Sequence, residues 1–195
     1  MILFGITGGI GMGKSTAGNF LLGEGYSLVD TDVVARSTVE PGQPALLEIR
    51  AVFGDGIVDN TGELNREELA KIIFSDPASR QKLEAILHPR IRNAWQQEVQ
   101  GWREQGQKFG FVTIPLLFET NAQKLFDSVI CVACSSKTQM ERLRSRGWND
   151  TQIQQRIDAQ WPVEKKMAAS DYLVWTDTTM EMHHEQLRRI LQTVS

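Results

Sequence analysis

The sequence predicts an α/β fold with a parallel five-stranded sheet flanked by helices. Five short apolar runs have the length and β-branched content of buried parallel strands: Ile2–Thr7, Ser27–Asp30, Phe109–Ile114, Ser128–Ala133 and Tyr172–Trp175. Longer segments with helical periodicity separate these runs, as in folds whose parallel strands are joined by helices. Ligands of such sheets bind at the carboxyl ends of the strands, so we expect the functional residues there.

Length and charge narrow the class of protein. The chain has 195 residues, with 21 Lys and Arg against 24 Asp and Glu, and so carries a net charge of −3. A domain of this length buries roughly 70% of the surface that its unfolded chain exposes, so it needs no disulfide or metal for stability. The acidic balance gives no basic field for nucleic acid, and no apolar run reaches the ~20 residues of a membrane span. We expect a cytoplasmic protein that binds neither nucleic acid nor membrane.

Two longer helical segments interrupt the strands. Before the third strand the pattern predicts three helices and no convincing strand: Pro44–Phe53, Leu64–Ser75 and Ser79–Gln105. We interpret this segment as a helical insertion. A second helical stretch, Ser136–Ala169, lies between the last two strands. Its basic residues include Arg142, Arg144, Arg146, Arg156, Lys165 and Lys166.

The first strand leads directly into a glycine-rich phosphate-binding motif. Gly8-Gly-Ile-Gly-Met-Gly-Lys-Ser15 fits the pattern G-x-x-x-x-G-K-[ST] of a P-loop. Glycines permit the backbone angles that point successive N–H groups into one concavity, and the next helix adds the positive end of its dipole. Lys14 supplies a charge for the β- and γ-phosphates, and the Ser15 hydroxyl is placed to ligate Mg²⁺. The predicted nucleotide-binding residues are Gly8, Gly9, Ile10, Gly11, Met12, Gly13, Lys14, Ser15 and Thr16.

The second strand ends in two carboxylates, in Asp30-Thr-Asp-Val-Val-Ala-Arg36. The strand pattern brings them to the carboxyl edge of the sheet, beside the predicted P-loop. One carboxylate there can orient an acceptor hydroxyl and take its proton, which with Mg²⁺ and nearby cations is chemically sufficient for phosphoryl transfer. No N-K-x-D stretch of the kind that reads guanine is present, so a GTPase has no support. The alternative is that Asp30 and Asp32 only cap the following helix.

Two other pairs of reactive side chains have structural interpretations. Cys131 and Cys134 form a C-x-x-C, but they lie in a β-branched run in which residues three apart point to opposite faces. We expect buried thiols rather than a redox pair or a zinc site. His183 and His184 are adjacent on a predicted helix and face different directions, so we expect a surface role rather than metal binding.

Further motifs extend in order along almost the whole chain. Leu87-His-Pro89 and Pro115-Leu-Leu-Phe-Glu119 come first, and Gln139 to Arg146 then carries two arginines four residues apart. The last motifs are Arg156 with Gln160, Lys166, and Ser170-Asp-Tyr172. This order resembles the dephospho-coenzyme A kinase family, with its opening T-G-G-I-G-S-G-K-S, its D-A-D-x-x-A-R and its L-H-P. The opening appears here as Thr7 to Ser15 and the second motif as Asp30 to Arg36.

The resemblance implies ATP-dependent phosphorylation of the 3′-hydroxyl on the adenosine ribose of dephospho-coenzyme A, the last step of coenzyme A biosynthesis. ATP and Mg²⁺ are the implied cofactors. The implied architecture is a P-loop kinase fold with a helical substrate-binding insertion and a helical lid, in one domain, 1–195. Its parts would be a core at about 1–36, 108–135 and 170–195, a substrate subdomain at about 37–107, and a lid at about 136–169.

The resemblance also assigns acceptor-side roles. Asp32, the second acid of the D-x-D, would be the catalytic base and would contact the acceptor together with Arg36. His88 and Pro89 would lie near the acceptor within the helical insertion.

The remaining implied roles concern the lid and the strand ends. Arg142 and Arg146, with Lys14, would be catalytic, since residues four apart share a helical face and can converge on one anion. The alternative is a solvated charged face. Glu119 either organises magnesium waters or ends a strand. Met12 replaces the family's usual small residue, and we expect altered packing over the phosphates with function retained.

Two other functions stay open. Another P-loop nucleoside or nucleotide kinase would share the loop, the arginines and the base, but the helical insertion distinguishes it. A non-catalytic ATP-sensing module would lack an acceptor-side acid, and Asp32 argues against it.

Overall fold

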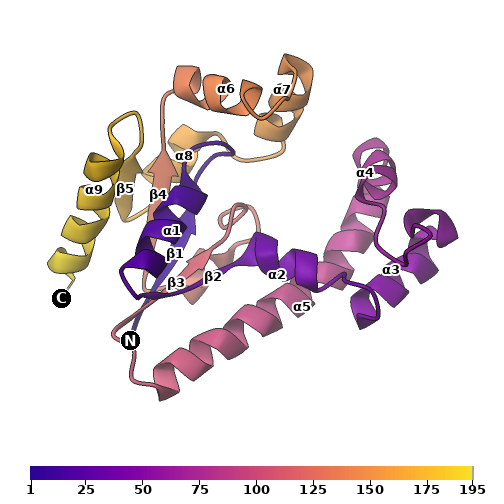
Figure 1. The fold of residues 1–195 in the computed structure, drawn as a ribbon, viewed down its shortest axis with the longest axis horizontal. Helices are drawn as coiled ribbons and strands as arrows, with labels where there is room; N and C mark the ends of the chain where they lie inside the picture. Colours follow the sequence, from indigo (N-terminus) through magenta and orange to yellow (C-terminus); the bar gives the residue numbers. More distant parts are fainter. Residues whose placement is uncertain (195) are drawn as a thin grey trace. The chain divides into compact units, whose positions relative to one another are not determined.

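The computed structural model describes residues 1–194, apart from the side chain of Phe74, and confirms the predicted sheet (Figure 1). All five strands are parallel, in the order β2-β3-β1-β4-β5. They are β1 (Ile2–Thr7), β2 (Ser27–Asp30), β3 (Phe109–Thr113), β4 (Ser128–Ala133) and β5 (Tyr172–Trp175). The third strand ends one residue earlier than predicted.

The helices fill the segments between the strands. They are α1 (Lys14–Gly23), α2 (Thr31–Ser37), α3 (Pro44–Phe53), α4 (Arg66–Ser75), α5 (Pro77–Glu104), α6 (Ser136–Arg144), α7 (Asp150–Asp158), α8 (Val163–Ala168) and α9 (Met180–Thr193). Two short 3-10 turns, η1 (Asp55–Ile57) and η2 (Ala122–Leu125), complete the order. Among the helices that the structure describes, none combines the length and apolar character that crossing a membrane requires.

The chain divides into two compact units. The sheet unit consists of Met1–Asp30 and the chain from Trp102 onward, and the helical unit is Thr31–Gly101. The sheet unit therefore contains all five strands and the helices α6 to α8.

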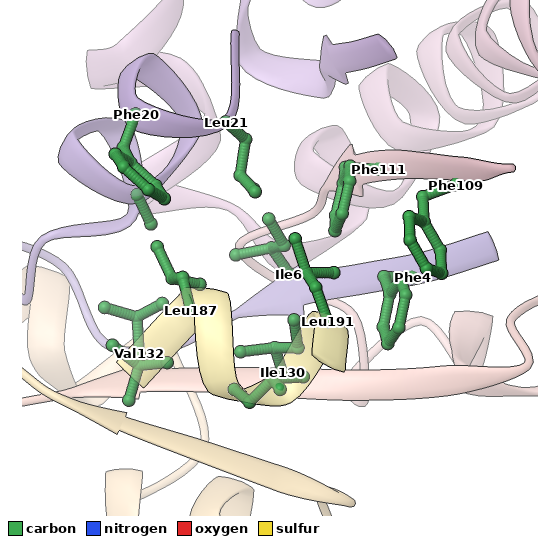
Figure 2. Packing of buried hydrophobic residues seen from close by; sticks show 13 residues of the cluster. Phe4, Ile6, Phe20, Leu21, Phe109, Phe111, Ile130, Val132, Leu187 and Leu191 are labelled. Atoms are coloured by element: carbon green, nitrogen blue, oxygen red, sulfur yellow. The ribbon is translucent and has the colours of Figure 1, made fainter. Parts of the chain in front are cut away.

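The core of the sheet unit lies where α1 and α9 pack on the central strands. Figure 2 shows Phe20 and Leu21 of α1 and Leu187 of α9 directed towards side chains of β1 and β4. Phe4 stacks on Phe111 of the neighbouring strand, with ring centroids 5.2 Å apart. This packing fixes the central strands, and with them the position at which the P-loop leaves β1.

Gly5 shows how closely the other face of the sheet is covered. A Cβ atom built at Gly5 would lie 2.7 Å from a methyl group of Leu117 and 2.9 Å from the ring of Phe126. Both distances are shorter than side chains tolerate, so the segment after β3 can pack against β1 only because this position has no side chain.

The helical unit has its own core and departs from the prediction at its turns. Buried apolar residues of α3, α4 and α5 form this core: Ala45, Ile49, Leu69, Leu83 and Ile86. Helix α4 begins two residues later than predicted, because Asn65 caps it by accepting from the Glu68 N–H. Leu64 pairs instead with Val58 in an isolated antiparallel bridge, where no strand is predicted.

Helix α5 begins two residues earlier than predicted and continues through a proline. The Asp76 carboxylate accepts from the N–H groups of Ala78 and Ser79, and Pro77 opens the helix, where its missing N–H costs nothing. Pro89 lies inside the helix without ending it.

The predicted helical stretch Ser136–Ala169 consists of three helices, α6, α7 and α8. After α6 the chain turns at Gly147, whose φ is 84°. Asn149 and Gln152 then form a capping box that starts α7, and α8 begins after Pro162.

Candidate active site

The P-loop takes a course that only glycine permits. Gly8, Gly11 and Gly13 have φ angles of 142°, 74° and 103°. A Cβ atom at Gly8 would lie 2.0 Å from the main-chain oxygen of Val132. Gly13 is the N-cap of α1, which begins at Lys14 with no acidic residue in its first turn. The N–H groups at the start of α1 therefore suit an anion.

Lys14 folds back over this loop. Its Nζ donates to the main-chain oxygens of Gly8 and Gly9, at 2.9 Å each. Ser15 is exposed and Thr16 is half-buried, both in the first turn of α1. The structure thus brings the predicted phosphate-binding residues together in one loop and one helix end.

The site fits a nucleoside triphosphate with Mg²⁺. The loop supplies N–H donors and an ammonium group for the phosphates, and Ser15 supplies an exposed hydroxyl for the metal. Within residues 1–194, no three His, Cys, Asp or Glu side chains are arranged to hold a metal ion by themselves. The chemistry of this set suits an ion held largely by phosphate oxygens.

The predicted acceptor-side residues begin at the boundary of the two units. Asp30 is the last residue of β2 in the sheet unit. Asp32 is an exposed residue in the first turn of α2, in the helical unit. A carboxylate at this position also stabilises a helix N-terminus, so the capping alternative stays open. Its role as a base remains a prediction.

The other acceptor-side residues also lie in the helical unit. Arg36 is in the last turn of α2, and His88 and Pro89 are in α5. All three are exposed, so each is accessible to a ligand. Their contact with the acceptor remains a prediction.

Only the first of the two arginines predicted for the lid lies in α6, so the pair does not share one helix as its spacing predicts. Helix α6 ends at Arg144, and Arg146 lies in the turn before Gly147. The left-handed conformation of this glycine terminates the helix, so Arg146 is not part of it. Arg146 is exposed, whereas Arg142 donates to the hydroxyl and main-chain oxygens of Thr176, at 2.8 and 2.7 Å.

Met12 is buried in the sheet unit, and its effect on packing over the phosphates remains a prediction. Its side chain is 2% exposed, in a cluster with Cys131, Ala133 and Cys134. Both thiols are buried and reduced, as predicted, and burial raises the pKa of Cys131 to about 11. They pack in one cluster rather than on opposite faces, since β4 ends at Ala133 and the strand alternation does not extend to Cys134.

His183 is also buried, and the predicted surface role is wrong. Only 2% of the residue is exposed, and burial lowers the pKa of its imidazole, as do the nearby charges of His184 and Arg142. His184 stacks on Phe20 with ring centroids 4.1 Å apart. Both histidines therefore take part in the packing of α9 within the sheet unit.

Glu119 forms a buried ion pair that its sequence position does not predict. Its Oε1 lies 2.9 Å from Nζ of Lys166 and accepts from the Trp161 N–H at 2.7 Å. Lys166, whose side chain is fully buried, also donates to the Pro115 oxygen at 2.7 Å. The pair therefore ties the segment after β3 to α8 and to the chain before it.

Three further side chains that contact the P-loop were not predicted as site residues. Gln139 of α6 donates to the main-chain oxygen of Ile10, and Gln160 accepts from the Ile10 N–H. Thr176, directly after β5, donates to the main-chain oxygen of Met12. Polar residues in a helix or a turn ordinarily face solvent, so only the position of Gln139 and Gln160 within ordered motifs could have drawn attention to them.

The parallel sheet, the P-loop and the helices that follow β4 define a P-loop kinase. The same fold occurs in a shikimate kinase from Bacteroides thetaiotaomicron, which is 14% identical, with a TM-score of 0.53 over 98% of both chains.

The particular family follows from closer matches. Residues 2–181 match the family model described as dephospho-CoA kinase. A dephospho-CoA kinase from Anaeromyxobacter dehalogenans is 41% identical over 89% of this chain and 83% of its own length. A solved structure from Thermus thermophilus is 30% identical, with a TM-score of 0.87 over 100% of this chain and 98% of its own. The chain belongs to the dephospho-CoA kinase family.

Proposed function

We propose that this chain transfers the γ-phosphoryl group of ATP to the 3′-hydroxyl of the ribose of dephospho-coenzyme A, giving coenzyme A and ADP. This reaction is the last step of coenzyme A biosynthesis. The observation that carries the proposal is the family match over residues 2–181, which includes the intact P-loop.

The P-loop binds and orients the donor. Main-chain N–H groups of the loop and of the first turn of α1 donate to the phosphate oxygens, and Lys14 neutralises charge on the β- and γ-phosphates. The Ser15 hydroxyl would be among the ligands of Mg²⁺, which would supply further positive charge for the phosphate oxygens.

The acceptor side supplies a base and a cation. The oxygen of the ribose hydroxyl forms a bond to the γ-phosphorus, the bond from that phosphorus to the bridging oxygen breaks, and ADP leaves. Asp32 orients the hydroxyl and takes its proton. Of the two lid arginines we assign the approach to the transferring group to Arg146, which is exposed, since Arg142 binds Thr176.

A panel of acceptors tests the proposal. Purified protein with ATP and Mg²⁺ receives dephospho-coenzyme A, adenosine, AMP or shikimate, and mass spectrometry measures the phosphate on each. We expect the highest kcat/KM for dephospho-coenzyme A, because binding energy from its remote part can orient the reacting hydroxyl. A higher kcat/KM for any of the other three would refute the proposal in favour of another small-molecule kinase.

A further inference from the structure

Two buried side chains hold main-chain oxygens of the P-loop. Gln139 Nε2 donates to the Ile10 oxygen at 2.8 Å, and Thr176 Oγ1 donates to the Met12 oxygen at 3.0 Å. Gln139 is 6% exposed and Thr176 is 3% exposed, so water competes little for either bond. Both donors come from far along the chain, at the start of α6 and directly after β5.

Each of these bonds fixes the direction of an N–H group that it does not touch. In a trans peptide unit the C=O of one residue and the N–H of the next point in opposite directions. The bond to the Ile10 oxygen therefore sets the direction of the Gly11 N–H, and the bond to the Met12 oxygen sets that of the Gly13 N–H. A donor that holds an oxygen on one side of the loop turns the next N–H to the other side.

Both N–H groups belong to residues whose backbone would otherwise be poorly restrained. Gly11 and Gly13 have positive φ angles of 74° and 103°. Glycine populates positive and negative φ almost equally, so these peptide units would reorient at little cost without the two bonds. Glycine allows the loop to adopt the backbone conformation of an anion nest. The rigidity of the loop must come from other contacts.

Arg142 completes the arrangement at Thr176. A hydroxyl has one proton and two acceptor positions. Because Thr176 Oγ1 accepts from the Arg142 guanidinium at 2.8 Å, its own proton is directed to the Met12 oxygen. The second bond of Arg142, to the Thr176 main-chain oxygen at 2.7 Å, fixes the residue itself.

We infer that Gln139 and Thr176 are positioning residues that preorganise the P-loop for ATP, by directing the Gly11 and Gly13 N–H groups into the phosphate nest. The inference rests on the proposed function only in that the nest binds ATP phosphates. It does not depend on the identity of the acceptor. Arg142 supports the nest through Thr176 rather than by touching the phosphates.

Binding of Mg·ATP to the full chain, measured by titration calorimetry without an acceptor, tests the inference. Thr176→Val keeps the shape of the side chain and removes its donor, whereas Thr176→Ser keeps the donor. We expect Thr176→Val to raise Kd for Mg·ATP roughly threefold to tenfold, the effect of losing one buried hydrogen bond, and Thr176→Ser to stay within about twofold of the unmodified protein. Gln139→Leu should raise Kd to a similar extent.

Two further measurements separate positioning from mere stability. Thermal unfolding shows whether each variant folds, and the matched control Gln154→Leu removes a lid glutamine whose amide donates to Asp158 on the exposed side of α7. We expect Kd for Mg·ATP to be unchanged in this control. In turnover assays Thr176→Val and Gln139→Leu should raise KM for ATP but not KM for the acceptor.

An unchanged Kd for Mg·ATP in folded Gln139→Leu and Thr176→Val would overturn the inference, whether or not Tm is lowered. If Thr176→Val does not fold, Gln139→Leu decides the matter alone. Loss of Mg·ATP affinity would support the inference even if dephospho-coenzyme A proved to be the wrong acceptor, so the two proposals fail separately.

Discussion

At the scale of single residues, the phosphate site depends most on Lys14. Its ammonium group donates to the Gly8 and Gly9 oxygens, and the core clusters described above for the sheet unit are built from other side chains. A bound triphosphate offers that charge much stronger acceptors than two carbonyl groups. The side chain therefore serves the ligand more than the fold.

Replacing Lys14 should abolish activity without changing the fold. We expect Lys14→Ala to lower kcat/KM by at least about 10³-fold, because a positive charge on the transferring phosphates is lost in a site that depends on electrostatic stabilisation. Steady-state kinetics and circular dichroism measure the two effects. Lys137→Ala, which removes an exposed lysine of α6, is the matched control. Activity equal to that of the control would contradict the account of the phosphate site.

Asp32 carries the proposed proton transfer. Asp32→Asn keeps the size of the side chain and removes the charge that aligns the hydroxyl, so kcat should fall by roughly 10²–10⁴ with little change in Kd for ATP. The loss of kcat should lie near the lower end of this range, because the largely dissociative transition state of phosphoryl transfer depends little on proton removal by the base. Kinetics across a magnesium titration, with Asp30→Asn beside it, measure both acids.

The magnesium dependence separates the roles of the two aspartates. If Asp30 acts through Mg²⁺ or its waters, added magnesium should restore Asp30→Asn in part and leave Asp32→Asn unchanged. Rescue of Asp32→Asn by magnesium, beside a severe and magnesium-independent loss in Asp30→Asn, would mean that the two roles are exchanged.

The burial of His183 makes stability depend on pH. Because burial lowers the pKa of the folded imidazole, the unfolded chain takes up a proton below about pH 6.5 while the folded chain stays neutral at this position. Stability from this residue is therefore present above pH 6.5 and lost as the pH falls. Urea unfolding at pH 8 and pH 5.5 should show a smaller pH dependence in His183→Leu than in the unmodified protein. An equal change in the free energy of unfolding between the two pH values in both proteins would show that other groups cause the pH dependence.

At the scale of elements, the strands and the P-loop could be predicted because their signals are local. Each strand is a short apolar run, and β1 leads directly into the glycines that need positive φ. Element ends in the helical segments could not be predicted as well. The break between α6 and α7 depends on Gly147 and Asn149, and the start of α5 depends on Asp76. Such caps compete weakly with the apolar pattern, so they shift ends without changing the elements.

The ion pair of Glu119 and Lys166 links elements and should matter for stability. Glu119→Ala leaves a fully buried ammonium group with the Pro115 oxygen but without its carboxylate, so the free energy of unfolding should fall by about 3–5 kcal/mol. Urea unfolding measures the change. Glu185→Ala, which breaks the exposed pair with Arg189 in α9, should cost less than about 1 kcal/mol.

A double variant sharpens this test. Glu119→Ala combined with Lys166→Met removes the buried charge along with its partner, so it should be less destabilised than the sum of the two single variants. Additive losses would contradict the assignment of an energetic coupling to this pair.

At the scale of the whole molecule, the contacts that complete the site join distant parts of the sequence. Gln139 is 129 positions from Ile10, and Thr176 is 164 positions from Met12. The motif predicts the nest, but many polar residues after β4 could have faced the loop, and no periodicity selects Gln139, Gln160 or Thr176. The ion pair of Glu119 and Lys166 could not be predicted either, because charged residues are rarely buried.

The central claim is that this P-loop kinase phosphorylates the ribose 3′-hydroxyl of dephospho-coenzyme A. The most direct measurement is ³¹P NMR of the product formed by the purified protein from dephospho-coenzyme A, ATP and Mg²⁺, with Lys14→Ala as the inactive reference. We expect one new phosphomonoester signal, coupled to the ribose 3′-proton, in an amount equal to the ADP released. A phosphate at any other position, or ADP released without a phosphorylated acceptor, would contradict the claim.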